Sequence, residues 1–149
     1  MNKACEHAQE FIEGLINDIG FDVKVSAEFN DEGCVLDLAG PDSHLLHAEN
    51  GEMLDAFETL LFQIYGRELD REHRFICDAD GFRKTRTAEL HAMAKFAAKN
   101  VRDKGVPFTF GVLNSTERRI IHLVLSEEDD LVTESVGQGR DRRLQVRPK

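Results

Sequence analysis

The apolar positions of residues 1–80 follow two spacings, which predict alternating helices and strands. Steps of three and four mark amphipathic helices, whereas every second position marks a strand with one buried face. Turn residues such as Gly, Asn and Asp separate these segments. In chain order we expect a helix over 4–19, the two strands of a hairpin over 21–29 and 34–38, a short helical piece ending near His47, a helix over 52–65 and a strand over 73–77.

Residues 80–149 continue the mixture with a longer helix. The expected elements are a helix over 82–103, an extended segment over 108–112, a helix ending near Leu125 and two strands over 131–136 and 143–147. Asn114 followed by Glu117 resembles a capping box, in which each side chain bonds the other residue's backbone N–H at a helix start. The pattern predicts an α+β fold with two small domains, 1–79 and 80–149, divided at a turn.

The charge of the chain changes sign near the same turn. Residues 1–80 hold 5 Lys and Arg against 19 Asp and Glu, a net charge of −14. Residues 81–149 hold 14 against 9, a net charge of +5, and the overall −9 conceals this contrast. A polyanion is therefore repelled by the first half and attracted by the second. On the long helix the cations lie opposite the apolar stripe: Lys84, His91, Lys95, Lys99 and Arg102.

Several classes of protein are disfavoured. No apolar run is long enough to span a membrane and no signal-peptide pattern is present, so we expect a cytoplasmic protein with no membrane partner. Cys5, Cys34 and Cys77 are far apart and outside any CxxC pair, so we expect neither a disulfide framework nor a zinc site. His44 and His47 have a metal-ligand spacing but no second ligand pair. No phosphate loop or nucleophile motif stands out, so we expect no enzyme, cofactor or metal.

The candidate binding residues lie in the last third of the chain. Arg118 and His122 are four residues apart and share one helical face, and Arg119 widens the same patch. A guanidinium binds phosphate and stacks on bases, and an imidazole can stack or donate a hydrogen bond. The following strand pair adds more cations: Arg140, Arg142, Arg143, Arg147 and Lys149. Phe108 and Phe110 could also stack on bases, although alternate aromatics on a strand are more often core.

Three stretches carry a resemblance to a known domain: 117–122 (Glu-Arg-Arg-Ile-Ile-His), 134–139 and 142–146. They resemble the domain named for its Arg-xxx-His motif, which is associated with single-stranded DNA and RNA. The typical Gly-Glu-Gly turn of that domain is Gly-Gln-Gly here. The first half looks like a type II KH domain, and the two together resemble the Jag (SpoIIIJ-associated) family of bacterial RNA-binding proteins. The resemblance implies nucleic-acid contacts by Arg118, Arg119 and His122, supported by Arg140, Arg142 and Arg143.

One loop departs from the KH pattern. KH domains clamp about four nucleotides with a GxxG loop, whose glycines allow close backbone approach. The matching positions are Ala48-Glu49-Asn50-Gly51, so the first glycine is lost and a carboxylate faces phosphate. At about 4 Å and an effective dielectric near 20, one like-charge contact costs on the order of 4 kcal/mol before screening. We therefore expect a degenerate loop that does not bind RNA in the usual way.

Two functions are consistent with this sequence. The first is a non-catalytic protein that binds single-stranded RNA or DNA mainly through its C-terminal domain. The alternative is a protein-interaction adaptor or scaffold that has lost nucleic-acid binding, which the overall charge and Glu49 favour. In either case the KH-like half could contact another KH protein or a second copy of the chain.

Overall fold

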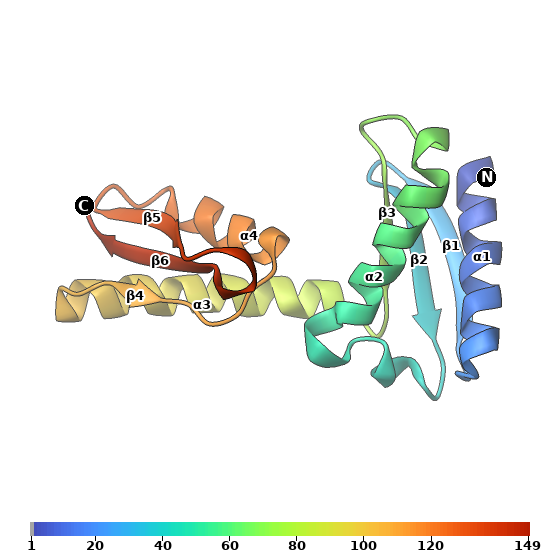
Figure 1. Ribbon diagram of the computed structural model, residues 1–149, viewed down its shortest axis with the longest axis horizontal. Coiled ribbons are helices and arrows are strands. Elements are labelled where there is room, and N and C mark those ends of the chain that lie inside the picture. The colour runs from blue at the N-terminus through green and yellow to red at the C-terminus, as the bar shows by residue number, and fades with distance from the viewer. Residues whose placement is uncertain (1) are drawn as a thin grey trace. The chain divides into compact units, whose positions relative to one another are not determined.

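A computed structural model of the chain describes residues 2–149. Its elements, shown in Figure 1, are α1 (Lys3–Ile19), β1 (Lys24–Asn30), β2 (Gly33–Ala39), η1 (Ser43–Leu45), α2 (Ala48–Tyr65), η2 (Gly66–Glu68), β3 (Arg74–Asp78), α3 (Phe82–Lys104), β4 (Phe108–Thr109), α4 (Ser115–Leu125), β5 (Leu131–Val136), η3 (Gly139–Asp141) and β6 (Arg143–Pro148). The chain divides into two compact units, one up to Arg83 and one from Lys84 to Lys149. Each unit contains one sheet and packed helices, so the predicted α+β class is confirmed.

The first unit is a mixed three-stranded sheet with two long helices. Its strand order is β1-β2-β3; β1 and β2 form the predicted antiparallel hairpin, and β3 lies parallel to β2. Helices α1 and α2 contact each other as well as the sheet, so together they cover one of its faces. The largest side chains buried in this core are Ile12, Leu36, Leu38, Leu46, Leu54 and Leu61.

A disulfide joins α1 to β2 in this unit. Cys5 and Cys34 are bonded, with their Cα atoms 5.3 Å apart, within the usual range for a disulfide. The expectation of unpaired cysteines is wrong for this pair. The two residues are 29 apart in sequence, and only the packing of the first turns of α1 on β2 brings their buried side chains together. Cys77 is a buried free thiol, and burial raises its pKa.

The backbone at the start of α2 is left-handed. Glu49, Asn50 and Gly51 have φ values of 54°, 58° and 77°, so the continuous helix begins after them, near the predicted start. Gly51 is buried, and a Cβ there would lie 2.4 Å from the ring of Phe82. This position therefore needs glycine for its backbone conformation and for space.

Asp80 holds the residues that precede this left-handed segment. Its carboxylate accepts a hydrogen bond from the Ser43 hydroxyl at 2.9 Å and contacts Nε2 of His47 at 3.0 Å. The hydrogen bond from Ser43, followed by that from His47, lowers the pKa of Asp80. The His47 ring also stacks on Phe82 with 5.8 Å between centroids. The loop over 43–51 is thus fixed by polar and aromatic contacts within its own unit.

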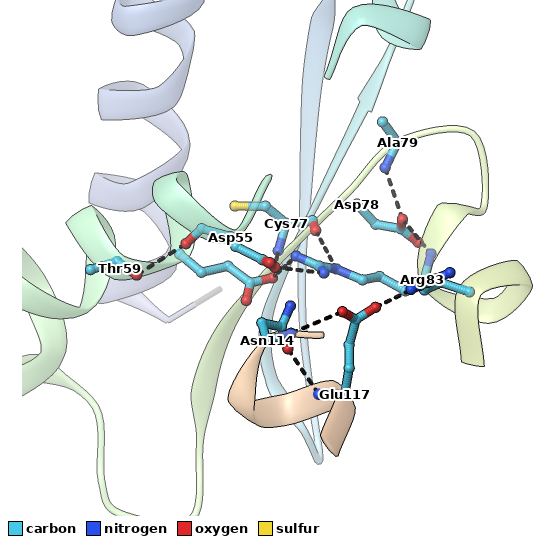
Figure 2. Close-up of polar contacts among 10 residues, drawn as sticks. Asp55, Thr59, Cys77, Asp78, Ala79, Arg83, Asn114 and Glu117 are labelled. Atoms are coloured by element: carbon cyan, nitrogen blue, oxygen red, sulfur yellow. Dashed lines mark hydrogen bonds and ion pairs between the residues drawn. The ribbon is translucent and has the colours of Figure 1, made fainter. Parts of the chain in front are cut away.

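Arg83 closes the first unit with a set of polar contacts (Figure 2). Its guanidinium lies 2.8 Å from Asp55 Oδ1 and 2.8 Å from Glu58 Oε2, and its Nε donates to the Cys77 carbonyl. Glu58 is mostly buried, and this burial raises its pKa although Arg83 opposes the shift. The pair of carboxylates on α2 therefore anchors the segment that follows β3.

The second unit packs α3 and α4 on an antiparallel sheet of order β4-β6-β5. Strand β4 is shorter than the extended segment predicted over 108–112, because beyond Thr109 the ladder ends with one bond from Phe110 N to the Leu144 carbonyl. The buried side chains of this core include Leu90, Ala94, Val101, Phe110, Ile121, Leu125, Leu144 and Val146. No helix in residues 2–149 is both long and apolar enough to cross a membrane.

The start of α4 is fixed by Glu117. The predicted capping box is confirmed: the Asn114 side chain accepts from Glu117 N at 2.8 Å, and Glu117 Oε1 accepts from Asn114 N at 3.2 Å, as Figure 2 shows. The other Glu117 oxygen lies 2.5 Å from Nε of Arg86 on α3. The two side chains are only 14% and 8% exposed, Arg86 and Glu117 respectively, so each charge depends on the other.

We expect the Gly51→Ala substitution to lower the free energy of unfolding. A non-glycine residue at this φ costs about 1–3 kcal/mol, to which the overlap with Phe82 adds. Urea unfolding followed by circular dichroism measures the change. The matched control is Gly14→Ala, because Gly14 lies exposed in α1 with nothing near its Cβ position. That variant should gain roughly 0.5–1 kcal/mol, and equal losses in both would contradict the packing described for Gly51.

We expect the Arg86→Ala substitution to destabilise the second unit strongly. It leaves the buried Glu117 carboxylate without its cation, which costs on the order of 3 kcal/mol. Lys99→Ala is the control, since Lys99 also lies on α3 but pairs with Asp103 in solvent, where such a pair contributes about 0.5 kcal/mol at most. Urea midpoints of the two variants decide the comparison. Similar midpoints would show that the Arg86 pair is not buried in solution.

Candidate nucleic-acid interface

Arg118 is half-buried at the start of α4, and a backbone carbonyl positions its guanidinium. Its Nη1 donates to the Leu113 carbonyl at 2.7 Å. That carbonyl lies in the segment leading into the helix, so the capping box that fixes this segment also fixes the arginine. Within residues 2–149 no carboxylate forms an ion pair with Arg118. Its charge is therefore oriented but not neutralised.

His122 lies one turn further along the same face of α4 and is exposed. Its Nδ1 is 2.5 Å from the hydroxyl of Thr133 on β5. Ile121, which is fully buried, packs on the opposite side and keeps the histidine facing outward. The hydroxyl contact orients the ring, so that Nε2 is presented away from β5. Such an imidazole can stack on a base or hydrogen-bond a phosphate.

The remaining candidate arginines lie on α4 and in the β5–β6 connection. Arg119, Arg140 and Arg142 are exposed, and in the described part of the chain their side chains have no hydrogen-bonding or ion-pairing partner. Arg143 is half-buried, and its Nη1 contacts the Arg140 carbonyl at 3.3 Å. These four side chains therefore offer donors to an external anion.

A glycine shapes the connection that carries the hairpin arginines. Gly137 has a φ of 82°, and a Cβ there would lie 2.8 Å from the Asp141 carbonyl oxygen. This tight turn leads into η3, which presents Arg140. Three residues of β5, roughly 10 Å of strand, separate Thr133 from Val136 at the start of this turn. The His122 contact and the hairpin arginines are thus joined by one short stretch of edge strand.

Other cations of this unit are paired with acids. Arg102 contacts Asp130 at 2.6 Å and Glu128 at 2.8 Å, and these hydrogen bonds raise its pKa. Lys99 pairs with Asp103, and Arg147 lies 3.3 Å from Glu134. Part of the cationic face predicted on the long helix is therefore neutralised by the acidic run after α4, a pairing that the helical spacing does not predict.

The acidic loop of the first unit has the shape of a turn but no cation. Glu49 and Asn50 are exposed, and Gly51 is buried. The two neighbouring histidines form no metal site, because His47 is engaged by Asp80 and Phe82. Among residues 2–149 no three His, Cys, Asp or Glu side chains converge on a point where a metal ion could bind.

Sequence reasoning missed the groups that orient the candidate residues. The Leu113 carbonyl and the Thr133 hydroxyl carry no signal in the sequence, since each acts through a tertiary contact. The Gly-Gln-Gly turn is visible in the sequence, and the close contact at Gly137 explains its first glycine.

Comparison with known proteins adds two findings. Residues 88–148 match the family model of the Arg-xxx-His domain. The RNA-binding protein KhpB of Clostridium symbiosum is 27% identical over 135 residues, which are 89% of this chain and 61% of that protein. The RNA-binding protein KhpB of Lactiplantibacillus plantarum is 23% identical over 138 residues, which are 92% of this chain and 42% of that protein. The chain thus spans less than two thirds of the length of either relative.

The matched region contains α4 with Arg118 and His122 at the spacing that gives the domain its name, so the predicted domain type is confirmed. The chain therefore contains an Arg-xxx-His domain and is homologous to the KhpB proteins over about nine tenths of its length.

Proposed function

We propose that this chain binds single-stranded nucleic acid, RNA in particular, through its Arg-xxx-His domain and without a chemical step. The observation that carries the proposal is the pair Arg118 and His122 on one face of α4, oriented by a carbonyl and a hydroxyl instead of by carboxylates. The names of the two KhpB relatives favour RNA over DNA as the ligand.

The Arg118 guanidinium has donors beyond the one used on Leu113. With Nη1 held by the carbonyl, its other N–H groups can bind a phosphate oxygen without a search for the right rotamer. His122 supplies Nε2 and a flat ring one helical turn away. We infer that these two residues and Arg119 contact phosphate and base. Arg140, Arg142 and Arg143 then extend the contact with the backbone, which tolerates any sequence.

The first unit is proposed to be a type II KH domain with a degenerate GxxG loop. Its helix-hairpin-helix-strand order and the buried Gly51 support this assignment. Glu49 places a carboxylate where a phosphate would approach. The unit then acts as a scaffold or contacts protein, such as another KH protein or a second copy of this chain.

The second candidate function is a protein-interaction adaptor without nucleic-acid binding. The net charge of −14 in residues 1–80 favours it, because such a surface repels any polyanion. The two functions differ in one measurable respect: an adaptor binds no oligonucleotide even at low salt.

Replacing Arg118 or His122 with Ala should weaken binding of a labelled RNA of about ten nucleotides several-fold. Loss of one phosphate contact should also reduce the slope of log affinity against log salt by about 0.7 for Arg118→Ala. Fluorescence anisotropy at several salt concentrations measures both quantities. Arg67→Ala, which removes an exposed arginine from the first unit, is the control for the same change of charge. No binding by the wild type at about 50 mM salt would rule out the proposed function, and equal affinities of Arg118→Ala and Arg67→Ala would rule out the site.

A nuclear magnetic resonance titration with the same RNA should separate the two units. We expect amide shifts at Arg118, Arg119, His122 and residues 140–143. Residues 46–52 should keep their free positions, because Glu49 repels phosphate in the left-handed loop. RNA-dependent shifts confined to 46–52 would instead show that the KH-like loop still clamps nucleotides.

A further inference from the structure

The second unit contains an aromatic pocket separate from the arginine and histidine pair. It is lined by Ala92, Met93, Phe96, Phe108, Phe110 and Gly111, and its volume of about 310 Å³ lies at the low end of the range for ligand pockets. Phe96 comes from α3, whereas the other two rings come from β4 and the residue that follows it. The pocket thus lies where the long helix packs against the edge strand.

The three rings form a row that grades from core to surface. Phe110 is 3% exposed, Phe108 is half-buried, and Phe96 is 60% exposed. Phe108 meets Phe110 edge-to-face at 5.1 Å and Phe96 edge-to-face at 6.0 Å. Packing therefore explains Phe108 and Phe110, as it usually does for alternate aromatics on a strand. It does not explain Phe96, whose ring is mostly in water although an aromatic neighbour holds it in place.

Aromatic residues are scarce in this unit, which makes their grouping informative. Residues 84–149 contain no Tyr or Trp, and their only Phe residues are Phe96, Phe108 and Phe110. Every Phe ring of the second unit therefore lines the same pocket. Single-strand binding combines a cationic track with aromatic rings on which bases stack. If this unit stacks bases on a Phe ring, the pocket is the place where it does so.

The surroundings of the pocket favour a nucleotide over an apolar protein segment. Lys95 is adjacent to Phe96 and exposed, and Lys99 lies one helical turn further along. Gly111 has open space where a side chain would lie, so a ligand can approach the backbone there. Two residues later, Leu113 holds the Arg118 guanidinium through its carbonyl. That step spans at most about 7 Å of chain, so the pocket adjoins the proposed phosphate site.

We propose that Phe96, supported from behind by Phe108, stacks on an unpaired nucleobase of the strand whose phosphates Arg118 binds. The inference rests on the proposed function and adds to it a second subsite that reads a base by its flat face. Stacking of this kind accepts all four bases, since each has a π-face.

The test compares Phe96 variants on two ligands of equal length, an RNA of about ten nucleotides and an abasic sugar-phosphate strand. Phe96→Ala should lower the affinity for the RNA roughly 5- to 100-fold, with the salt slope unchanged because no phosphate contact is lost. Its affinity for the abasic strand should equal that of the wild type. Phe96→Leu should behave like Phe96→Ala, and Phe96→Trp should restore binding, because the ring and not apolar volume is required.

The control is Phe62→Ala, because Phe62 is 69% exposed and lies in the first unit. It should leave the RNA affinity unchanged. A 2-aminopurine base in the RNA should also lose fluorescence on binding the wild type and keep it with Phe96→Ala.

The outcomes separate this inference from the function on which it rests. Wild-type binding of RNA with no effect of Phe96→Ala would overturn the stacking site and leave the function of the Arg-xxx-His domain in place. No wild-type binding of either strand would overturn the function itself. Full RNA affinity in Phe96→Leu would show that the pocket accepts an apolar group instead of a base. A Phe96-dependent dimer in sedimentation, with RNA affinity unaffected, would show that a second copy fills the pocket.

Discussion

The buried carboxylate of Glu117 determines where α4 begins and therefore which way its functional face points. One oxygen closes the capping box on Asn114, and the other is paired with Arg86 on α3. The next residue of the helix is Arg118, so any slip in the helix start would rotate the guanidinium away from the Leu113 carbonyl. A charge that would be costly if unpaired is here used to set the register of the candidate binding surface.

The two units treat charge in opposite ways. In the Arg-xxx-His unit several cations are already neutralised by acids, and the arginines that are not so paired lie on α4 and in the β5–β6 connection. In the first unit the left-handed turn of a nucleotide-binding loop is kept, while its chemistry is acidic. Screening limits the reach of that acidic surface to about 8 Å at physiological ionic strength. A net charge of −9 is therefore compatible with local attraction of a polyanion by the Arg-xxx-His unit.

The sequence predicted what depends on local spacing. The capping box at Asn114, the shared face of Arg118 and His122, and the hairpin of the first unit follow from periodicity and turn residues, and the structure has them. It did not predict the Cys5–Cys34 disulfide, because that pair depends on how α1 packs on β2. The Arg86–Glu117 pair and the Thr133 contact of His122 were missed for the same reason. Spacing determines which residues share a face, whereas tertiary packing determines what each face meets.

Phe96 illustrates the remaining gap between pattern and function. Its neighbours on the apolar stripe of α3 are buried, and by periodicity alone Phe96 would be one more helix-surface residue. The structure places it against Phe108, so that the most exposed ring of the three is also a supported one. Holding a ring in place before a ligand arrives removes part of the entropy cost of stacking. The same reasoning applies to the guanidinium held by the Leu113 carbonyl, so both the cation and the ring are oriented in advance for a flexible strand.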